Sequence, residues 1–214
     1  MSRIDPRFLY VGTQGPSNAG LYRSLNTGVD WEAHSFPVTL SGVSQFIPWD
    51  IGEDPLDGTL YVPTEIDNHP QPYHPPAFRS DDRGATWTNI TGSLPWHGVR
   101  VIVQAPSHTV LFLTEGAGLF RSTDRGATWN PFGNASFADD LEIDPNNPSR
   151  MFGGDVYSSG RVGGVFLSTD GGVTFSPYGL DGRTCGSLSV AADSSRLYAA
   201  CYNLGIFVRR LPQQ

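Results

Sequence analysis

An eight-residue pattern, Ser-x-Asp-x-Gly-x-Thr-Trp, recurs along this chain of 214 residues and constrains its fold more than any other feature. It is complete at Ser80–Trp87 and Ser122–Trp129, and it returns with changes at Ser168–Phe175 and Ser24–Trp31. In such a segment an Asp or Asn oxygen accepts the backbone N–H groups that follow, and Gly takes a positive φ without steric cost. The pattern therefore predicts one tight turn, built four times, and no reaction chemistry.

Successive copies begin 42 to 56 residues apart, at Ser24, Ser80, Ser122 and Ser168. A four-stranded propeller blade has about that length. The 25 glycines, 17 prolines and 12% aromatic residues suit short strands joined by tight turns, and no long stretch has a helical apolar period. We therefore predict an all-β fold, a β-propeller of four-stranded antiparallel blades, about five in number.

Alignment of the repeats predicts a single domain, residues 1–214, whose strands we name A to D from the inside outward. The five units cover approximately residues 1–36, 37–92, 93–132, 133–180 and 181–214. Strand A is expected at Gly42–Trp49, Val99–Gln104, Ala138–Ile143 and Ser187–Ala191. Strand B is expected at Phe8–Thr13, Thr59–Thr64, Val110–Thr114, Arg150–Gly154 and Arg196–Cys201. Strand C is expected at Gly20–Ser24, Ala77–Ser80, Gly118–Ser122, Gly164–Ser168 and Gly205–Arg209.

The first and last units are incomplete. Ile4-Asp5-Pro6 matches Ile143-Asp144-Pro145, so the first unit begins at the tail of a strand A, while the last unit reaches strand C without a box. Because the open edges of a sheet need a partner, two arrangements stay open. The chain forms a small ring of five blades, or it forms part of a ring of six or seven that other residues or another chain complete.

These residues resemble the Asp-box, or BNR, repeat family, which includes sialidases, sortilin-type receptors, xyloglucan-cleaving glycoside hydrolases and a photosystem II assembly factor. The resemblance covers nearly the whole chain and implies that the boxes lie at C–D turns on one face. The B–C and D–A loops would form the opposite face, where such proteins bind their ligands. The residues implied to build the boxes are Ser24, Asn26, Gly28, Trp31, Ser80, Asp82, Gly84, Trp87, Ser122, Asp124, Gly126, Trp129, Ser168, Asp170, Gly172 and Phe175.

The B–C loop of the second unit, Glu65 to Pro76, is far longer than its counterparts, and long loops on a rigid scaffold concentrate recognition. Strand B ends in a carboxylate in three successive units, at Glu65, Glu115 and Asp155. Carboxylates beside aromatic rings suit sugar binding, and two acids about 5 to 10 Å apart are also the minimum of a glycosidase. The ligand-binding residues we predict are Glu65, Asp67, His69, Tyr73, His74, Trp96, Glu115, Asp155, Arg161 and Tyr202.

Specific enzyme signatures are missing. Sialidases announce the first of three arginines with Arg-Ile-Pro, and this chain has Arg3-Ile4-Asp5. Arg23, Arg79 and Arg121 repeat just before each box, which indicates a structural or outward-facing position. Ser-His-Asp and Cys-His nucleophile contexts are absent as well, so we assign no catalytic residue.

The charge balance excludes several partner classes. The formal net charge is −7, the pI is near 5.0, and all 14 basic residues are arginines. An acidic chain without a basic stripe disfavours nucleic acid, and no segment is long and apolar enough for direct membrane insertion. We assign no cofactor and no metal: Asp67, His69 and His74 are read as a rigid proline-rich loop. The acidic runs at 50–54 and 139–144 are read as solvated strand and turn residues.

Cys185 and Cys201 are expected at the ends of adjacent strands in the last unit. One reading is a cross-strand disulfide. It would close a loop of about 15 residues and stabilise the fold by about 3 kcal/mol. Two buried thiols are the other, since a register slip of one residue points the side chains apart.

We predict a binding or scaffolding module without catalytic activity, which presents its loop face to a protein or glycan partner. One alternative is a glycoside hydrolase or sialidase-like enzyme using Glu65, Glu115 or Asp155, and another is a structural subunit of a larger complex. The compartment stays open: periplasmic or extracellular if a leader was removed, cytoplasmic otherwise.

Overall fold

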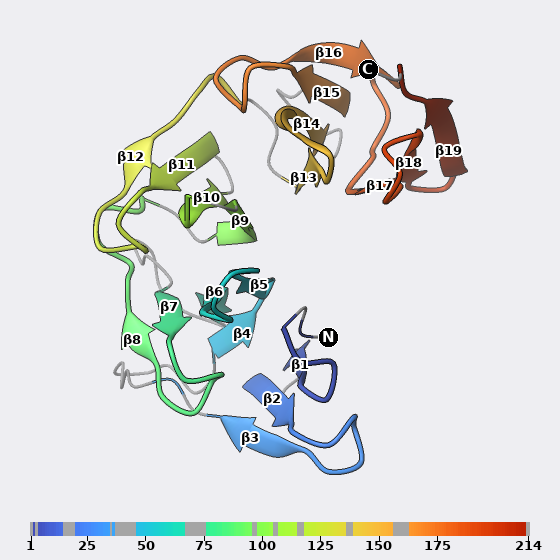
Figure 1. Cartoon of the computed structure of the whole chain (residues 1–214). Coiled ribbons are helices and arrows are strands. Elements are labelled where there is room, and N and C mark those ends of the chain that lie inside the picture. Colours follow the sequence, from blue (N-terminus) through green and yellow to red (C-terminus); the bar gives the residue numbers. More distant parts are fainter. Residues whose placement is uncertain are drawn as a thin grey trace. The chain divides into compact units, whose positions relative to one another are not determined.

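The computed structural model of the chain describes residues 2, 4–14, 20–34, 36, 46–66, 76–95, 98–104, 107–114, 118–135, 139–155 and 163–212 (Figure 1). Within these ranges every helix or strand is a β-strand, and no helix that could span a membrane is found. The all-β prediction is confirmed.

The strands form five sheets, numbered here in chain order. Sheet 1 contains β1 (Leu9–Thr13), β2 (Gly20–Ser24) and β3 (Glu32–His34). Sheet 2 contains β4 (Phe46–Pro48), β5 (Gly52–Glu53), β6 (Leu60–Ile66), β7 (Ala77–Ser80) and β8 (Thr88–Asn89). Sheet 3 contains β9 (Gly98–Gln104), β10 (Thr109–Thr114), β11 (Gly118–Ser122) and β12 (Asn130–Pro131). Sheet 4 contains β13 (Asp140–Asp144), β14 (Asn147–Asp155), β15 (Gly164–Ser168) and β16 (Ser176–Gly179), and sheet 5 contains β17 (Ser187–Val190), β18 (Arg196–Cys201) and β19 (Gly205–Arg210).

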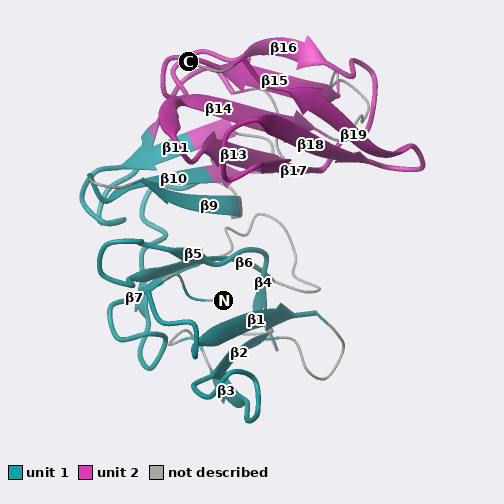
Figure 2. Ribbon diagram, turned by 45° about the vertical axis from the view of Figure 1, so that its right-hand side comes forward, with its two compact units in different colours: residues 1–112, 120–130 teal, residues 113–119, 131–214 magenta. Residues whose placement is uncertain are grey.

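Neighbours in each sheet are neighbours in the sequence, which is the up-and-down order of a propeller blade. In sheet 2, β4 and β5 both pair with β6 and so share the place of strand A. The described part of sheet 1 has no strand A, and that of sheet 5 has no strand D. The chain divides into two compact units, residues 1–112 with 120–130 and residues 113–119 with 131–214 (Figure 2). Each unit has a buried apolar core of its own.

Each box lies between the last two strands of its sheet, which are strands C and D of the blade. Its hydrogen bonds are nearly identical in sheets 2, 3 and 4. In sheet 2, Ser80 Oγ donates to Asp82 Oδ1 at 2.8 Å and accepts the Gly84 N–H at 2.7 Å. Asp82 accepts the Thr86 N–H at 2.8 Å and its hydroxyl at 2.6 Å. The boxes of sheets 3 and 4 repeat these four bonds at 2.6 to 2.9 Å.

The first box closes the same turn with exchanged chemistry. Asn26 stands where the other boxes have Asp, and Asp30 stands where they have Thr. The Asn26 amide donates to Asp30 Oδ2 at 2.8 Å, and Asn26 Oδ1 accepts the Asp30 N–H at 2.9 Å. The hydrogen bond between the side chains at these two positions is therefore kept. In the first box the donor is at the first position and the acid at the second, the reverse of the other boxes.

The aromatic residue that closes a box packs into the core. Trp87 is 7% exposed in a cluster with Leu21, Phe36, Leu60, Val62 and Phe78, so the ring joins side chains of sheets 1 and 2. Trp129 is 4% exposed, and its indole N–H donates to the Ile90 carbonyl at 2.7 Å. One box therefore supplies both a turn and a contact with the preceding sheet.

The arginines before the boxes connect neighbouring sheets. Arg23 Nη1 of sheet 1 donates to the Arg83 carbonyl in the box of sheet 2 at 3.0 Å. Arg79 of sheet 2 makes the same 3.0 Å bond to the Arg125 carbonyl in the box of sheet 3. At these two positions the arginine is structural, which was one of the two roles expected.

A second repeated device was not predicted. Asp50–Pro55 and Asp140–Pro145 share the spacing Asp-x-x-x-Asp-Pro, and we call them the paired-aspartate turns. The first aspartate of each accepts its own neighbour's N–H and reaches the inner strand of the next sheet: Asp50 accepts the Val101 N–H at 2.9 Å, and Asp140 accepts the Leu188 N–H at 2.5 Å.

The second aspartate of each turn is fully buried. Asp54 pairs with His108 Nδ1 at 2.5 Å, and Asp144 accepts the Ser194 hydroxyl and pairs with Arg150. His108 and Ser194 both have φ near +55°, at the turn before the second strand of their sheets. The expectation that these acidic runs are solvated is wrong for Asp54, Asp140 and Asp144, because hydrogen bonds from the next sheet compensate their burial.

Candidate functional site

Most of the predicted ligand-binding residues lie outside the described residues. These are Asp67, His69, Tyr73, His74, Trp96, Glu115 and Arg161. Glu65, Asp155 and Tyr202 are described, and they have three different environments.

Glu65 stands near the end of β6 and holds a tryptophan that the sequence had not singled out. The Trp49 indole N–H donates to Glu65 Oε2 at 2.9 Å, and the Trp49 side chain is 50% exposed. The backbone N–H of Trp49 donates to the Pro63 carbonyl at 3.0 Å, and Ile47 of β4 pairs with Glu65 in the sheet. A large ring is therefore fixed at the surface by two bonds, one from the indole and one from the backbone.

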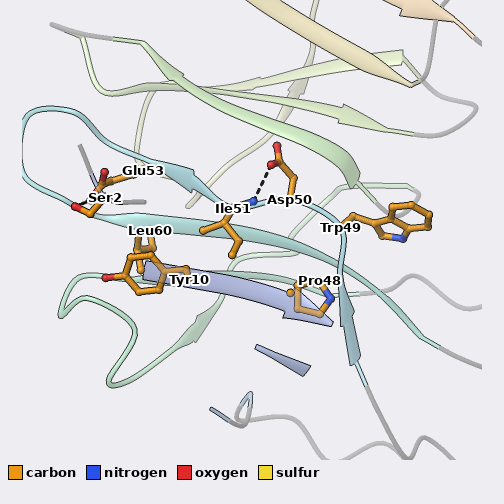
Figure 3. Close-up of a pocket in the computed structure, with 9 residues that line it drawn as sticks. Ser2, Tyr10, Pro48, Trp49, Asp50, Ile51, Glu53 and Leu60 are labelled. Carbon is orange, nitrogen blue, oxygen red and sulfur yellow. Dashed lines mark hydrogen bonds between the residues drawn. The ribbon is translucent and has the colours of Figure 1, made fainter. Parts of the chain in front are cut away.

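Trp49 borders a pocket of about 300 Å³ in the first compact unit (Figure 3). The pocket lies where β1 approaches β4, β5 and β6, and Gly12 permits that approach because a Cβ there would meet the Pro48 carbonyl oxygen at 2.9 Å. In Figure 3, Pro48 and Trp49 lie at one end of the row of labelled residues and Ser2 and Glu53 at the other. The lining residues are Ser2, Tyr10, Gly12, Pro48, Trp49, Asp50, Ile51, Glu53 and Leu60.

The polar groups of this pocket already have partners within the protein. Ser2 Oγ donates to Glu53 Oε1 at 2.5 Å, and the Tyr10 hydroxyl donates to the Arg83 carbonyl at 3.3 Å. Burial, together with the nearby Glu53 carboxylate, raises the pKa of Tyr10 to about 12, so its hydroxyl stays neutral. Asp50 is committed to the Ile51 and Val101 N–H groups. These groups hold the wall of the pocket in place through bonds within the protein.

Asp155 and Tyr202 belong to the second unit. Asp155 ends β14 with 1% of its surface exposed, so its carboxylate lies inside the fold and is not offered to a surface ligand. Tyr202 is 74% exposed in the β18–β19 turn, where its backbone N–H donates to the Thr184 carbonyl at 2.7 Å. Glu65 and Tyr202 are therefore the two predicted ligand-binding residues that the described structure leaves accessible.

Tyr202 follows a disulfide. Cys185 and Cys201 are bonded to each other across 16 positions of sequence, and both are buried. The disulfide ties the segment before β17 to the end of β18. It fixes the base of the turn that presents Tyr202.

Asp54, Asp57 and His108 form the cluster of potential metal ligands among the described residues, with ligand atoms within 4.8 Å of one another. Arg125 Nη2 lies 2.7 Å from Asp57 Oδ2 and 3.3 Å from His108 Nδ1. This guanidinium supplies the positive charge that a cation would otherwise provide. The Asp57 pKa is lowered against the opposing effect of burial by bonds from Thr59 and Arg125. The cluster is explained as an ion-pair network of the first paired-aspartate turn.

Comparison with known proteins connects this architecture to a family. The model described as "Sortilin, neurotensin receptor 3," of the Sortilin-Vps10 family matches residues 76–201, more than half of the chain. No curated protein sequence matches the chain significantly.

Several solved structures share the fold at low sequence identity. The GH74 enzyme of Niastella koreensis has a TM-score of 0.70 at 22% identity, with 94% of this chain and 32% of that chain covered. The GH74 xyloglucanase of Xanthomonas campestris has a TM-score of 0.72 at 19% identity, covering 93% and 32%. YCF48 of Cyanidioschyzon merolae has a TM-score of 0.66 at 15% identity, covering 98% and 65%. The chain thus spans about a third of the GH74 chains and just under two thirds of YCF48.

The likeness to these structures shows that the five sheets are blades of a β-propeller. The boxes recur at the same turn of four blades, and the family match runs through three of them. The chain belongs to the sortilin (Sortilin-Vps10) family of BNR, or Asp-box, β-propellers.

Proposed function

We propose that this protein is a binding module without catalytic activity that recognises a protein or glycan partner, with Trp49 and Glu65 at the point of contact. The observation that carries the proposal is the half-exposed Trp49 ring whose N–H is held by the Glu65 carboxylate. A fixed aromatic surface loses little conformational entropy on binding, which is why such rings dominate binding energetics.

A glycan suits this geometry best. The apolar face of a sugar ring stacks on an indole, and a carboxylate beside the indole accepts sugar hydroxyls. The adjoining pocket of about 300 Å³ is at the small end of ligand-binding cavities, the size for one or two sugar units. In the sequence, Glu65 is also followed closely by residues 67–75, which include four further residues predicted to bind the ligand.

Relatives in fold support both kinds of partner. One relative in fold is a xyloglucanase and another is a sialidase, so those proteins act on glycans. YCF48 is described in complex with a D1 peptide. All are under 25% identical to this chain, so the choice between a glycan and a protein depends on the residues of this chain.

The alternative of a glycoside hydrolase needs two acids that reach one substrate. Of the three acids proposed for it, Asp155 is buried, and Glu115 lies outside the described residues. Glu65 is engaged with Trp49. This engagement suits a supporting group for a stacking ring better than a proton donor.

The experiment is a glycan array probed with the purified protein, followed by titration of each hit with Trp49→Ala and Glu65→Gln. Trp31→Ala is the matched control, because Trp31 is also exposed (42%) and also bonds through its indole N–H, but it belongs to a box. We expect Trp49→Ala to weaken binding about tenfold or more and Trp31→Ala to leave it unchanged.

Other results would redirect the proposal. Hydrolysis of any hit would support the enzyme alternative. Binding that is equally sensitive to both tryptophan variants would contradict the site. If no glycan binds and the protein purifies from its source as a defined larger species that Trp49→Ala disrupts, the partner is a protein at the same site.

A further inference from the structure

The outer edge of sheet 5 differs from the same edge of the other four sheets. In sheets 1, 2 and 4 strand C pairs antiparallel with an outer strand D, as in Leu21 with His34, Phe78 with Asn89 and Val165 with Gly179. Sheet 3 likewise places β12 beside β11. Within the described residues, β19 pairs with β18 alone. Its apolar side chains are exposed, with Ile206 at 71%, Val208 at 55% and Phe207 at 38%.

The strand registers show what sheet 5 lacks. The box serine lies opposite Leu9 in sheet 1, Leu60 in sheet 2 and Met151 in sheet 4. The corresponding residue opposite Leu197 in sheet 5 is Arg209. Within the described residues, sheet 5 therefore has neither the box turn nor the aromatic side chain that a box delivers.

A cavity of about 280 Å³ lies where that aromatic side chain would go. Two residues of its wall, Val165 of sheet 4 and Leu197 of sheet 5, occupy the strand positions that Leu21 and Leu60 have in sheets 1 and 2. In sheets 1 and 2, Leu21 and Leu60 pack around Trp87. Phe207 corresponds to Phe78 and Ala199 to Val62, since each pair lies directly opposite in its sheet. The other residues that line it are Tyr178, Gly179, Leu180, Val208 and Arg209.

Arg209 replaces only the hydrogen bond that the indole N–H of a box tryptophan would donate. Trp129 donates its indole N–H to the carbonyl of Ile90, three residues after the preceding box aromatic, Trp87. Arg209 Nη1 donates at 2.6 Å to the carbonyl of Tyr178, three residues after Phe175. Its guanidinium also lies 3.8 Å from the centre of the Tyr178 ring. The carbonyls of Ile90 and Tyr178 therefore each accept a hydrogen bond, but Arg209 does not fill the apolar cavity of sheet 5 as a tryptophan ring would.

We propose that an extended segment of a partner protein pairs with the free edge of β19 and inserts an aromatic side chain into this cavity. Main-chain hydrogen bonds along β19 would give affinity, and the cavity would select an aromatic residue near the strand's start. The sister sheets define this occupant, because each covers the same edge with a strand that an aromatic residue precedes. A second copy of this chain is a poor source of such a strand. Trp87, Trp129 and Phe175 are all under 9% exposed. Trp31 is 42% exposed, but its indole N–H donates to the Gly28 carbonyl of its own box and the strand that follows it, β3, pairs with β2.

The test uses a fluorescent synthetic peptide with the sequence of residues 80–91, which contains one complete box and its strand. We expect saturable binding to the purified protein, a loss of about tenfold or more when the peptide's tryptophan is alanine, and slower amide exchange along β19. Phe207→Glu, which charges the cavity wall, should weaken binding by about as much. Ile206→Glu is the matched control, because Ile206 is the adjacent residue of β19 and does not line this cavity.

Three results would overturn the proposal. One is the absence of saturable binding at millimolar peptide while both variants remain folded. Another is binding that responds to Ile206→Glu and ignores both the peptide tryptophan and Phe207→Glu. The third is a concentration-dependent dimer that Phe207→Glu dissociates, which would make a second copy the occupant.

Discussion

Asp144 at the end of β13 accepts the hydroxyl hydrogen of Ser194 from the β17–β18 turn, 50 residues further along the chain. Asp54 and His108 form the corresponding pair between sheets 2 and 3. In both pairs a fully buried carboxylate of one blade fixes a left-handed residue in the turn of the next blade. These blades are therefore joined by buried polar pairs at the inner turns, in addition to the aromatic packing and hydrogen bonds at the boxes.

Replacing Asp54 by Ala should lower the free energy of unfolding by about 2 to 4 kcal/mol, because the Leu56 N–H and His108 would lose their buried acceptor. Asp57→Ala is the control on the same turn, since this partly exposed carboxylate pairs with a partly exposed Arg125 and should cost about 1 kcal/mol or less. Urea denaturation measures both. Equal losses of unfolding free energy in the two variants would contradict a larger contribution from the buried Asp54.

Acid should destabilise the boxes in a narrow pH window. Hydrogen bonds from Thr128 and Thr174 lower the pKa of Asp124 and Asp170 to about 2, and those from Thr86 and Ser80 do so for Asp82 against the effect of burial. A carboxyl whose pKa is lower in the folded state binds fewer protons than in the unfolded state, so its contribution is complete above the ordinary pKa of 3.8 and is lost as pH falls toward about 2.

The measurement is the urea midpoint between pH 6 and pH 2 for the wild type and for the triple variant Asp82→Asn, Asp124→Asn, Asp170→Asn. The variant should fold, because Asn26 already forms this turn in sheet 1. Its midpoint should fall less steeply below pH 4 than that of the wild type. If the urea midpoints of the two proteins fall in parallel as the pH is lowered, the box aspartates are not the source of the acid sensitivity.

Two glycines with positive φ should respond very differently to alanine. At Gly133, with φ of 69°, a Cβ would lie 2.1 Å from the Gly172 carbonyl oxygen, so the backbone must move and we expect a loss of about 3 kcal/mol or more. Gly171 has a similar φ of 74° but open space around it, and Arg83 and Arg125 occupy its equivalent in other boxes. Gly171→Ala should cost about 1 to 2 kcal/mol at most. Thermal unfolding of both variants checks the contrast, and a reversed order would contradict the geometry.

Loss of the disulfide should destabilise the protein by about 3 kcal/mol, the value for closing a loop of this size. Cys185 and Cys201 are 16 positions apart. The effect is measured as the denaturation midpoint with and without reductant. The double variant Cys185→Ala, Cys201→Ala should have the midpoint of the reduced wild type, and reductant should not change it. An unchanged midpoint on reduction of the wild type would contradict this contribution.

Strand C could be predicted to the residue because its end is encoded locally. The box serine closes the turn through bonds that span at most four residues, and β2, β7, β11 and β15 all end at that serine. β19 runs one residue beyond its expected end, and no box follows it.

The paired-aspartate turns could not be predicted in the same way. Asp54 and Asp144 are charged residues beside proline, a pattern that is usually solvated, and their partners lie 54 and 50 residues away. The repeated Asp-x-x-x-Asp-Pro spacing was the available signal. Trp49 was missed because an aromatic residue at the end of an inner strand is normally core. Its indole N–H donates to Glu65, which is 16 residues away.

The paired-aspartate turns also govern how the blades come apart. If sheet 5 opens, Asp140 and Asp144 of sheet 4 lose the Leu188 N–H and the Ser194 hydroxyl and remain in a low-dielectric interior without those donors. Local opening of one blade therefore raises the free energy of its neighbour. Amide exchange should reveal sheets 4 and 5 as one cooperative unit and sheets 2 and 3 as another.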